Sequence, residues 1–480
     1  MKTHHIIVIA ATICASFGCS RHEEEDGLRP QQPDTDLSVR SVVAAPIAET
    51  RTALDNQRNV VWKSGDRIHI HSVACAPQGL IQALCARGRA GELKNIKLQH
   101  LHTEGAAPYA EQEFEGVFQL ESYFVGHNVR KATQDGWADY IPVHLSETQK
   151  LIRMGITPVD VAMIQVCPPD KHGYVSMGTS VDATLAAVQT AKTVIAVINP
   201  NVPRAWGDAI IKLSDIDIFC EDNTPLIEAK PAQPSEQDIQ IGKNCAGLIE
   251  DGACLQMGIG AIPNAVLSQL GNHKNLGIHT EMFADGVLPL YYKGVINNLN
   301  KKYDKGKIVS TFLMGSKAVY DFIDDNPAVA MMDVGYTNDP YIIAQQPKMT
   351  AINSALSIDL TGQVNADSLG CKFYSGCGGQ LDFIRGAAAS EGGKPIIAMP
   401  AITAKGISKI SPTLLNGAGV VTTRFDVHYV VTEYGVADLY GKTLQDRAKA
   451  LIRIAAPQCQ EELDKAAFER FGSHFHFITK

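Results

Sequence analysis

Short runs of aliphatic and β-branched residues alternate with helical stretches along most of this chain, and this alternation restricts the fold more than any other feature. Four runs end in turn residues: TVIAVINP (193–200), ACLQMGI (253–259), KPIIAMPA (394–401) and DVHYVVTEYG (426–435). Uninterrupted apolar runs of this length are typical of strands buried on both faces of a parallel sheet in βαβ units. The sequence therefore predicts an α/β fold.

The first ordered elements follow the same pattern. NVVWKSGDRIHIHS (59–72) indicates the entry of a strand. APQGLIQALCARGRAGEL (76–93) predicts a helix, because Leu80, Ile81 and Leu84 fall on one helical face.

A weak internal repeat indicates that the α/β unit occurs twice. An offset of 200 residues aligns 174–200 with 374–400 and gives five identities in 27 positions. The identical pairs are Tyr174 with Tyr374, Gly178 with Gly378, Asp182 with Asp382, Ala187 with Ala387, and Pro200 with Pro400. Both segments share the order glycine turn, helix, strand, proline. We predict two tandem, structurally similar open α/β domains, at 58–235 and 236–480, divided within the proline-rich segment 229–238.

Composition excludes several other classes of protein. A length of 480 residues with 45% hydrophobic content is enough for two or three domains. The formal net charge of −8 argues against a nucleic-acid partner, which needs a basic surface to neutralise phosphates. No run of about 20 apolar residues is present, so no membrane span is predicted. The 11 cysteines are scattered without a C-x-x-C pair, which favours free thiols in a reducing compartment.

Residues 1–57 precede the predicted domains. MKTHHIIVIAATICASFGC has a basic start and an apolar run from Ile6 to Ile13, as in a signal peptide, but it also has no acidic residue before Glu23, as in a mitochondrial presequence. The polar, proline-bearing segment 20–36 follows. We interpret the whole segment as a targeting or disordered extension.

The turn MGIGAIPNAVLSQL (257–270) joins an apolar run to a predicted helix whose first turn contains Pro263. Glycines in such a turn let backbone N–H groups approach a phosphate, and the helix N-terminus favours negative charge. A tight turn without a ligand is the alternative reading. The third glycine of a dinucleotide fingerprint is missing, so NAD binding is not predicted.

A second glycine turn, GCGGQLDFIRGA (376–387), also precedes a predicted helix. Gly378 and Gly379 could present consecutive amide donors, as stabilisation of an oxyanion requires. The alternative is a purely structural turn. Asp382 and Arg385 stand three residues apart and could pair with each other on the helix surface.

Signatures of other chemistries are incomplete. GVADLYGKT (435–443) has five residues rather than four between Gly435 and Gly441, so the phosphate cradle of a P-loop would not close. A G-x-S-x-G nucleophile elbow is absent from the sequence. The His and Glu residues of HTEGAAPY (102–109) lack metal-ligand spacing. We therefore predict neither a metal site nor a tightly bound cofactor.

The segment GIHTEMFADG (277–286) places one acidic residue, Glu281, among apolar neighbours. Together with MGIGAIPNA, GCGGQLDFIRGA, AKGISKI and TEYGVADLYGKT, it makes the chain resemble the acetyl-CoA hydrolase/4-hydroxybutyrate CoA-transferase family of class I CoA-transferases. The resemblance extends from about residue 59 to about residue 472. It implies two open α/β domains of the NagB/CoA-transferase type with the active site at their interface, and the catalytic glutamate of the family falls on Glu281.

The resemblance also indicates where coenzyme A, a substrate, would bind. It places CoA on the turn formed by Gly258, Ile259, Gly260, Ala261 and Ile262, and near Gly379. Lys405 and Lys409 could meet the CoA phosphates, or could belong to a solvated loop. Asn353 and Gln380 are further candidates for contacts with the carboxylate or the pantetheine arm. The chain departs from the family pattern at Lys409, where arginine is usual, and at Cys377, where an aliphatic residue is common.

The chemistry of a carboxylate fits transfer of CoA between acids. Glu281 can attack an acyl-CoA and then carry the CoA as a glutamyl thioester, because it belongs to the same chemical class as both substrates. Gly378 and Gly379 are the candidate oxyanion donors. The function predicted is CoA transfer between a short acyl-CoA and a small carboxylate such as acetate, succinate or 4-hydroxybutyrate. Hydrolysis of acetyl-CoA on the same scaffold, and CoA binding without turnover, are the alternatives.

The resemblance bears on assembly and location as well. We expect acyl-CoA and small carboxylates as partners and a homodimer or higher homo-oligomer as the assembly. CoA chemistry and free cysteines favour a mitochondrial location, with secretory or cytoplasmic location as alternatives.

Overall fold

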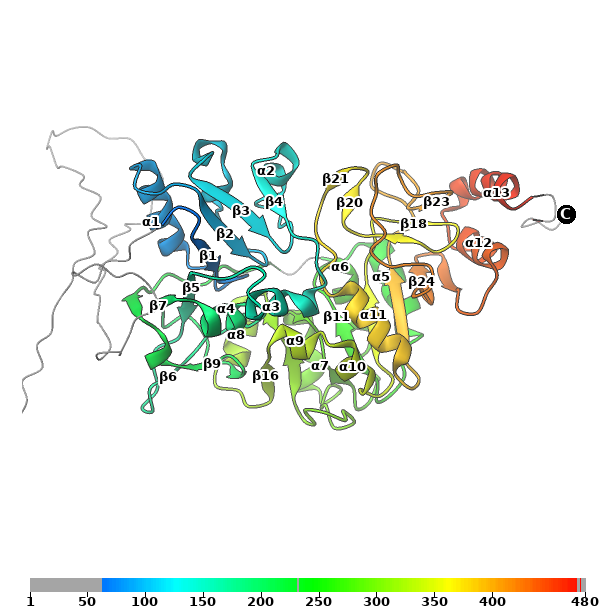
Figure 1. Cartoon of the computed structure of the whole chain (residues 1–480). Coiled ribbons are helices and arrows are strands. Elements are labelled where there is room, and N and C mark those ends of the chain that lie inside the picture. The colour runs from blue at the N-terminus through cyan, green and yellow to red at the C-terminus, as the bar shows by residue number, and fades with distance from the viewer. Residues whose placement is uncertain (1–62, 231–232, 473–474, 476–480) are drawn as a thin grey trace, which may run out of the picture.

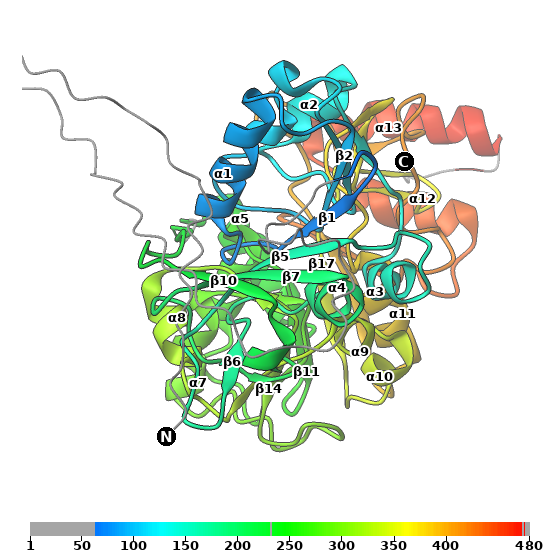
Figure 2. The ribbon, with the colours of Figure 1, turned by 60° about the vertical axis from the view of Figure 1, so that its left-hand side comes forward.

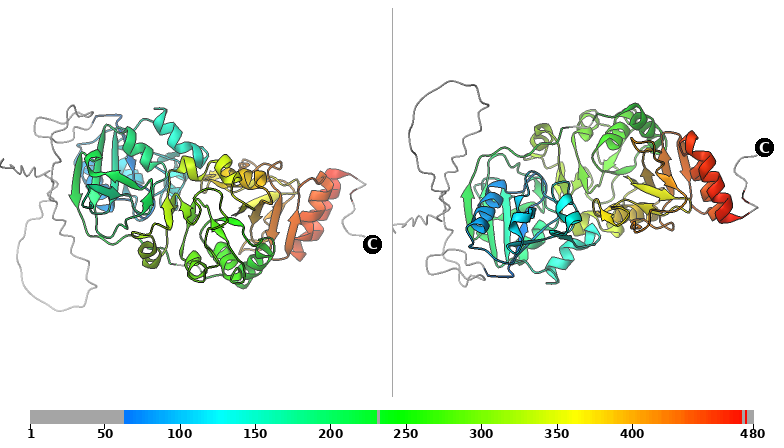
Figure 3. Two further views of the ribbon diagram at one scale, coloured as in Figure 1. Left: turned by 90° about the horizontal axis from the view of Figure 1, so that it is seen from below. Right: turned by 90° about the horizontal axis from the view of Figure 1, so that it is seen from above.

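The computed structural model describes residues 63–230, 233–472 and 475. Two halves, each built on a largely parallel sheet, lie side by side along the long direction of the molecule (Figures 1 and 3). The predicted α/β class with two open domains is confirmed. The predicted extension 1–57, and the start of the strand entry at 59–62, lie outside the described residues.

The first half is built on a seven-stranded sheet of order β10-β7-β5-β1-β2-β3-β4. Its strands are β1 (Arg67–Ile70), β2 (Ile96–His100), β3 (Phe118–Ser122), β4 (Ala138–Tyr140), β5 (Val161–Val166), β7 (Thr193–Ile198) and β10 (Ile218–Glu221). All neighbouring pairs in this sheet are parallel. The chain runs outward from β1 in one direction to β4 and then returns to β5 and runs to β10, which makes this a doubly wound sheet.

The second half is built on a six-stranded sheet of order β12-β11-β17-β22-β24-β25. Its strands are β11 (Cys254–Met257), β12 (Gly277–Ile278), β17 (Thr350–Asn353), β22 (Lys394–Ala398), β24 (Tyr429–Thr432) and β25 (Gly435–Asp438). Only the edge strand β25 is antiparallel to its neighbour. The strand order reverses between β11 and β17, so the carboxyl ends of these two strands form the switch point of the sheet.

All four predicted apolar runs contain a parallel strand as expected, namely β7, β11, β22 and β24. The fourth run, 426–435, is followed by a further strand that the sequence did not predict. A turn at Glu433 and Tyr434 ends β24, and the chain folds back as β25. A two-residue turn between paired strands reverses direction without a crossover helix, which explains why the last strand pair is antiparallel.

Thirteen helices lie within the described residues. They are α1 (Gln78–Arg89), α2 (Arg130–Asp135), α3 (Leu145–Arg153), α4 (Thr184–Thr190), α5 (Glu236–Ala246), α6 (Ala261–Gln269), α7 (Leu288–Tyr292), α8 (Lys317–Ile323), α9 (Val334–Thr337), α10 (Pro340–Ala344), α11 (Gln380–Ala389), α12 (Leu444–Arg453) and α13 (Pro457–Phe471). The helix expected within 76–93 is α1, which buries Ile81 and Leu84 against the first sheet.

The segments related by the 200-residue offset have the same local structure. Helix α4 and strand β7 in the first half correspond to helix α11 and strand β22 in the second. Gly178 and Gly378 both have positive φ, at 66° and 54°. Asp182 and Asp382 are both buried, with exposed fractions of 0% and 5%. The predicted division between the domains falls between β10 and α5.

Shorter strands complete the structure. They are β6 (Tyr174–Ser176), β8 (Trp206–Gly207), β9 (Ile210–Lys212), β13 (Met282–Phe283), β14 (Ile308–Ser310), β15 (Phe312–Leu313), β16 (Val329–Met331), β18 (Ser357–Asp359), β19 (Val364–Asn365), β20 (Ser368–Leu369), β21 (Lys372–Phe373) and β23 (Ile410–Ser411). Strand β8 of the first half pairs with β16 of the second, so the two halves share a small sheet.

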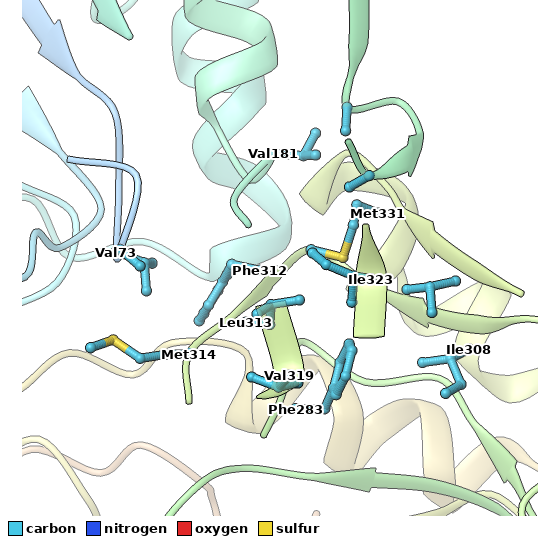
Figure 4. Close-up of a cluster of buried hydrophobic side chains, with 14 of the residues drawn as sticks. Val73, Val181, Phe283, Ile308, Phe312, Leu313, Met314, Val319, Ile323 and Met331 are labelled. Atoms are coloured by element: carbon cyan, nitrogen blue, oxygen red, sulfur yellow. The ribbon is translucent and has the colours of Figure 1, made fainter. Parts of the chain in front are cut away.

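The hydrophobic core is continuous across the junction of the halves. Figure 4 shows Val73 and Val181 of the first half near Phe312 and Leu313 of the second. Helix α3 of the first half also packs against α9 of the second (Figure 2). Because one close-packed core joins both halves, groups contributed from each half can be held in a fixed geometry.

Candidate active site

Glu281 lies between the short strands β12 and β13, and its backbone is held firmly. Its carbonyl oxygen accepts hydrogen bonds from Ser310 Oγ (2.9 Å), Thr311 N (3.1 Å) and Phe312 N (3.2 Å). The hydroxyl oxygen of the preceding residue, Thr280, lies 3.1 Å from Met257 O and 2.9 Å from Met282 O. Its single proton can be donated to either of these carbonyl oxygens. These bonds tie the glutamate to the end of β11 on one side and to β14 and β15 on the other.

The carboxylate of Glu281 is largely enclosed and accepts bonds from neutral donors. Asn338 Nδ2 donates to its Oε2 at 3.0 Å, and the backbone N–H of Gly379 also bonds the carboxylate. Burial raises the pKa of Glu281 to about 7, and the nearby charge of Asp382 acts in the same direction, whereas the two hydrogen bonds partly oppose the shift. A carboxylate desolvated in this way is a stronger nucleophile than one in water, and with a pKa of about 7 roughly half of it is ionised at pH 7.

The glycine turn beside Glu281 is fixed by the first half of the molecule. Leu145 N donates to Gly378 O at 3.1 Å, and the Cys377 thiol donates to Val143 O at 3.0 Å. Further along, Arg130 Nε donates to Tyr374 O at 2.6 Å. The turn therefore contacts both halves, although in sequence it belongs to the second half.

Asp382, at the start of α11, strengthens the same junction. It accepts bonds from Ser146 N (3.1 Å) and Ser146 Oγ (2.9 Å), and so it caps the N-terminus of α3 from the other half of the chain. Arg385 is exposed. The suggested surface pairing of Asp382 with Arg385 is wrong, because the aspartate turns inward to satisfy the first backbone donors of α3.

Gly379 is buried directly against the carboxylate. A Cβ atom at this position would lie 2.1 Å from both Glu281 Oε2 and Asn338 Nδ2. Gly379 is also the N-cap of α11, so the positive end of the helix dipole lies near Glu281. Only glycine leaves room for this approach.

A cavity of about 200 Å³ opens in front of Glu281. It lies at the carboxyl ends of β11 and β17, the switch point where open α/β sheets bind ligands. Its lining residues are Phe124, Gln256, Gly258, Glu281, Met282, Asn353, Ser354, Ala366, Gly376, Cys377, Gly378, Gly379 and Gln380. Phe124 comes from the first half, and the others come from the second.

Six of the residues proposed from sequence line this cavity together. They are Gly258, Glu281, Asn353, Gly378, Gly379 and Gln380. The side chains of Asn353 and Gln256 bond each other, with Asn353 Nδ2 donating at 3.0 Å. Gln380 Nε2 donates to Ser354 O at 2.7 Å. The lining thus mixes polar amides with apolar side chains, and Glu281 is the one acidic side chain among these lining residues.

The remaining predicted residues lie outside the lining. Ile259 is exposed, Gly260 has a φ of 115° and precedes α6, and Ala261 and Ile262 form the first turn of that helix. Lys405 is exposed.

Lys409 also lies outside the lining. It is half-buried, and burial lowers its pKa to about 8 while the charge of Glu433 opposes the shift.

Asn338 is the site residue that sequence reasoning missed. It stands 57 positions after Glu281, directly beyond the short helix α9, and no motif surrounds it. Phe124 was missed for the same reason. Gln256 and Ser354 were also missed, although they stand directly beside the predicted turn 257–270 and the predicted residue Asn353, which is the signal that could have found them.

The described residues hold no group of three or more His, Cys, Asp or Glu side chains arranged to bind a metal ion. Among the same residues, none of the helices has the length and apolar character needed to cross a bilayer.

Comparison with known proteins agrees with this geometry. The N-terminal domain of the acetyl-CoA hydrolase/transferase family matches residues 56–228, and the C-terminal domain of that family matches residues 315–467. The two matches fall within the two α/β halves that flank the cavity beside Glu281. The chain belongs to the acetyl-CoA hydrolase/transferase family, as the sequence motifs predicted.

Named relatives of high identity are CoA-transferases. The succinyl-CoA:acetate/propanoyl-CoA:succinate CoA transferase of Fasciola hepatica is 52% identical over 411 residues, which cover 85% of this chain and 86% of the relative. The 4-hydroxybutyrate coenzyme A transferase of Clostridium kluyveri is 50% identical over 377 residues, covering 78% and 88%. The prediction that the chain is an enzyme of the CoA-transferase class is confirmed.

A solved structure shares the architecture. RipA from Yersinia pestis superposes with a TM-score of 0.81 at 36% identity, covering 85% of this chain and 94% of that one.

Proposed function

We propose that this enzyme transfers CoA between a short acyl-CoA and a small carboxylate such as acetate, succinate or 4-hydroxybutyrate, with Glu281 as the covalent carrier. The observation that supports this most strongly is the position of Glu281. Its carboxylate is enclosed, faces a cavity between the two halves, and accepts bonds from Asn338 and Gly379. The names of the relatives support the same reaction class.

The proposed reaction uses only carboxylate and thiolate chemistry. The Glu281 carboxylate attacks the acyl-CoA carbonyl carbon, the C–S bond breaks, and a mixed anhydride and CoA thiolate result. The thiolate then attacks the side-chain carbonyl carbon of Glu281. The bond from this carbon to the bridging oxygen breaks, which releases the first acid as a carboxylate and leaves a glutamyl-CoA thioester. A second carboxylate reverses these steps, and no net proton is consumed.

Gly379 and Asn338 are the groups that can stabilise charge during these steps. When thiolate attacks the Glu281 carbonyl, negative charge develops on the oxygen that these two donors already approach. Donors positioned before reaction lower the barrier without reorganisation. In this proposal Gly379 is the principal oxyanion donor, and Gly378 shapes the turn through its positive φ of 54°.

The CoA molecule would lie along the second half. We propose that the turn from Gly258 to Ile262 contacts it, because this turn joins the cavity to the N-terminus of α6. Lys405 and Lys409 would face the phosphates from the loop before β23, and Asn353 and Gln380 would contact the pantetheine arm or the acid from the cavity wall. A mitochondrial location and a homo-oligomeric assembly stay predictions from the sequence.

The raised pKa of Glu281 predicts a defined pH dependence. Since only the ionised carboxylate is nucleophilic, adduct formation should be constant above the pKa of about 7 and should fall as the pH drops below it. The fall should approach about tenfold per pH unit. Single-turnover rapid-quench mass spectrometry across pH 5–9 measures this limb. A rate that is flat down to about pH 5, near the ordinary glutamate pKa, would contradict the enclosed carboxylate.

Steady-state kinetics separates transfer from hydrolysis. Transfer through a covalent carrier predicts parallel lines when acyl-CoA and carboxylate are varied together, and slow release of free CoA without an acceptor. Hydrolysis is the competing function because Glu281 retains some exposure to the cavity, and because a 25% identical relative in Candida albicans is named an acetyl-CoA hydrolase. Release of CoA at the same rate with and without acetate or succinate would favour hydrolysis.

A further inference from the structure

His279 lies two residues before Glu281 and is completely buried. Its backbone N–H donates to Leu255 O at 3.1 Å, which fixes the residue beside β11. Its ring spans from this strand to the last residue of α9, where Nε2 lies 2.8 Å from Thr337 O. The ring does not line the cavity.

The hydrogen-bond partners fix the state of the ring. A carbonyl oxygen only accepts, so Nε2 carries the proton and donates to Thr337 O. Nδ1 faces Gln346 Nε2 at 3.5 Å. Burial lowers the pKa of His279 to about 3, and the charge of the nearby Lys301 acts in the same direction. The ring is therefore neutral at physiological pH and serves as a rigid donor, not as an acid or base.

The residue after Thr337 is Asn338, the donor to Glu281. Helix α9 has only four residues, too few to hold its own end in place. On one side the helix is held by the Asp333–Arg153 ion pair at 2.7 Å. On the other side, toward Glu281, His279 Nε2 donates to Thr337 O, the carbonyl group directly before Asn338. Within the described part of the chain, buried Asn338 Oδ1 has no hydrogen-bond partner, so the amide is held through its Nδ2 by Glu281 and Asp382 and otherwise by the backbone that carries it.

We propose that His279 is a positioning residue for the reaction: it holds the Thr337–Asn338 backbone so that the Asn338 amide stays on the Glu281 carboxylate. The path of contacts from Glu281 to Asn338, along the backbone to Thr337, and on to His279 forms a closed ring. It closes because His279 and Glu281 belong to the same short segment. The nucleophile and its donor are thus set against each other within a single rigid loop. This inference rests on the proposed role of Glu281.

The proposal predicts a shift in the pH below which the rate of adduct formation falls. The bond from Asn338 lowers the pKa of Glu281, so its loss should raise that pKa and move the limb to higher pH. The other titratable groups facing Glu281 are Asp382 and Cys377, and those near His279 are Lys301 and Tyr336; the substitutions below change none of them.

The test compares four variants of the full chain by single-turnover adduct formation against pH. His279→Leu removes the donor, and His279→Gln returns an N–H able to reach Thr337 O. We expect His279→Leu to slow the reaction roughly tenfold at pH 6.5, less at pH 8.5, with little change in KM for acyl-CoA, and His279→Gln to restore most of the rate. The single variant Asn338→Ala and the double variant His279→Leu/Asn338→Ala should show the same decrease in the rate of adduct formation at low pH, because His279 acts through Asn338.

A matched control tests whether loss of any buried histidine ring, through a general loss of packing, has the same effect. His71→Leu removes a buried ring whose Nε2 also lies 2.8 Å from a backbone carbonyl, that of Ser180. This control should lower the melting temperature without moving the limb. Additive effects of His279→Leu and Asn338→Ala, or an equal shift in the His71→Leu control, would overturn the proposal. Should labelling of unaltered enzyme miss Glu281, the proposed function fails instead, and the two failures are distinguishable.

Discussion

Glu281→Gln is expected to abolish the CoA adduct and to lower turnover by roughly 10⁴-fold or more, the scale seen when a covalent nucleophile is removed. Incubation of the unaltered enzyme with acyl-CoA and no acceptor should add the mass of CoA less water to the peptide spanning 277–286. The glutamine amide cannot attack the thioester, although it fills the same space. A label found on another peptide would end the assignment of Glu281 as carrier.

The same variant has a second, opposite effect on stability. A carboxyl whose pKa rises from the ordinary 4.5 to about 7 on folding is neutral in the folded state at a pH where the unfolded chain is already ionised. The native state therefore loses stability as the pH rises from 4.5 to 7, and the loss is complete above 7. Glu281→Gln should recover on the order of 2 kcal/mol at pH 8 and almost nothing at pH 4, measured by denaturant titration.

Asp217→Asn is a matched control for both readouts. Asp217 is a second carboxyl whose pKa is raised by burial, and it accepts a bond from Val194 N at the edge of the first sheet. The variant should keep its activity and form the adduct normally. Loss of the adduct in this control would show that the Glu281→Gln result reflects damage to the fold and not removal of the nucleophile.

The fold was predictable because its signals are local. Buried parallel strands need continuous apolar runs, and β7, β11 and β22 each lie inside such a run. The antiparallel strand β25 was not predicted, because only its first residue, Gly435, belongs to the apolar run 426–435 and only one of its four residues is buried.

The candidate site was predictable only where a motif carries it. Glu281 and the glycine turn stand out as an acidic residue among apolar ones and a cluster of glycines before a helix. Asn338, Phe124 and Ser146 reach the site from separate elements, and each has a side chain common at ordinary surfaces. Their roles depend on distances that follow from the packing of two halves, which no sequence spacing encodes.

The interpretation of Gly379 also needed the structure. The sequence predicts that Gly379 is a candidate oxyanion donor in a glycine turn, and the structure adds that the residue is buried against Glu281 and Asn338. Its φ of −95° and ψ of 13° are accessible to any residue, so backbone strain does not explain a glycine here. The reason is space, because the carboxylate occupies the volume that a side chain would take.

Gly379→Ala should therefore be nearly inactive in a chain that still folds. The new methyl group would lie 2.1 Å from Glu281 Oε2 and from Asn338 Nδ2, so one or both must move away. Displacing the carboxylate from its oxyanion donor should cost about 10²–10³-fold in turnover, the usual effect of losing one such donor, while substrate binding elsewhere in the cavity is retained.

Gly271→Ala, whose Cβ meets open space, is the control and should match the unaltered enzyme in turnover and melting temperature. Because alanine is compatible with the backbone at 379, circular dichroism and gel filtration should be unchanged. Full activity in Gly379→Ala would mean that the carboxylate and the turn separate during the reaction, and Gly379 could then not be the donor that stabilises its charge.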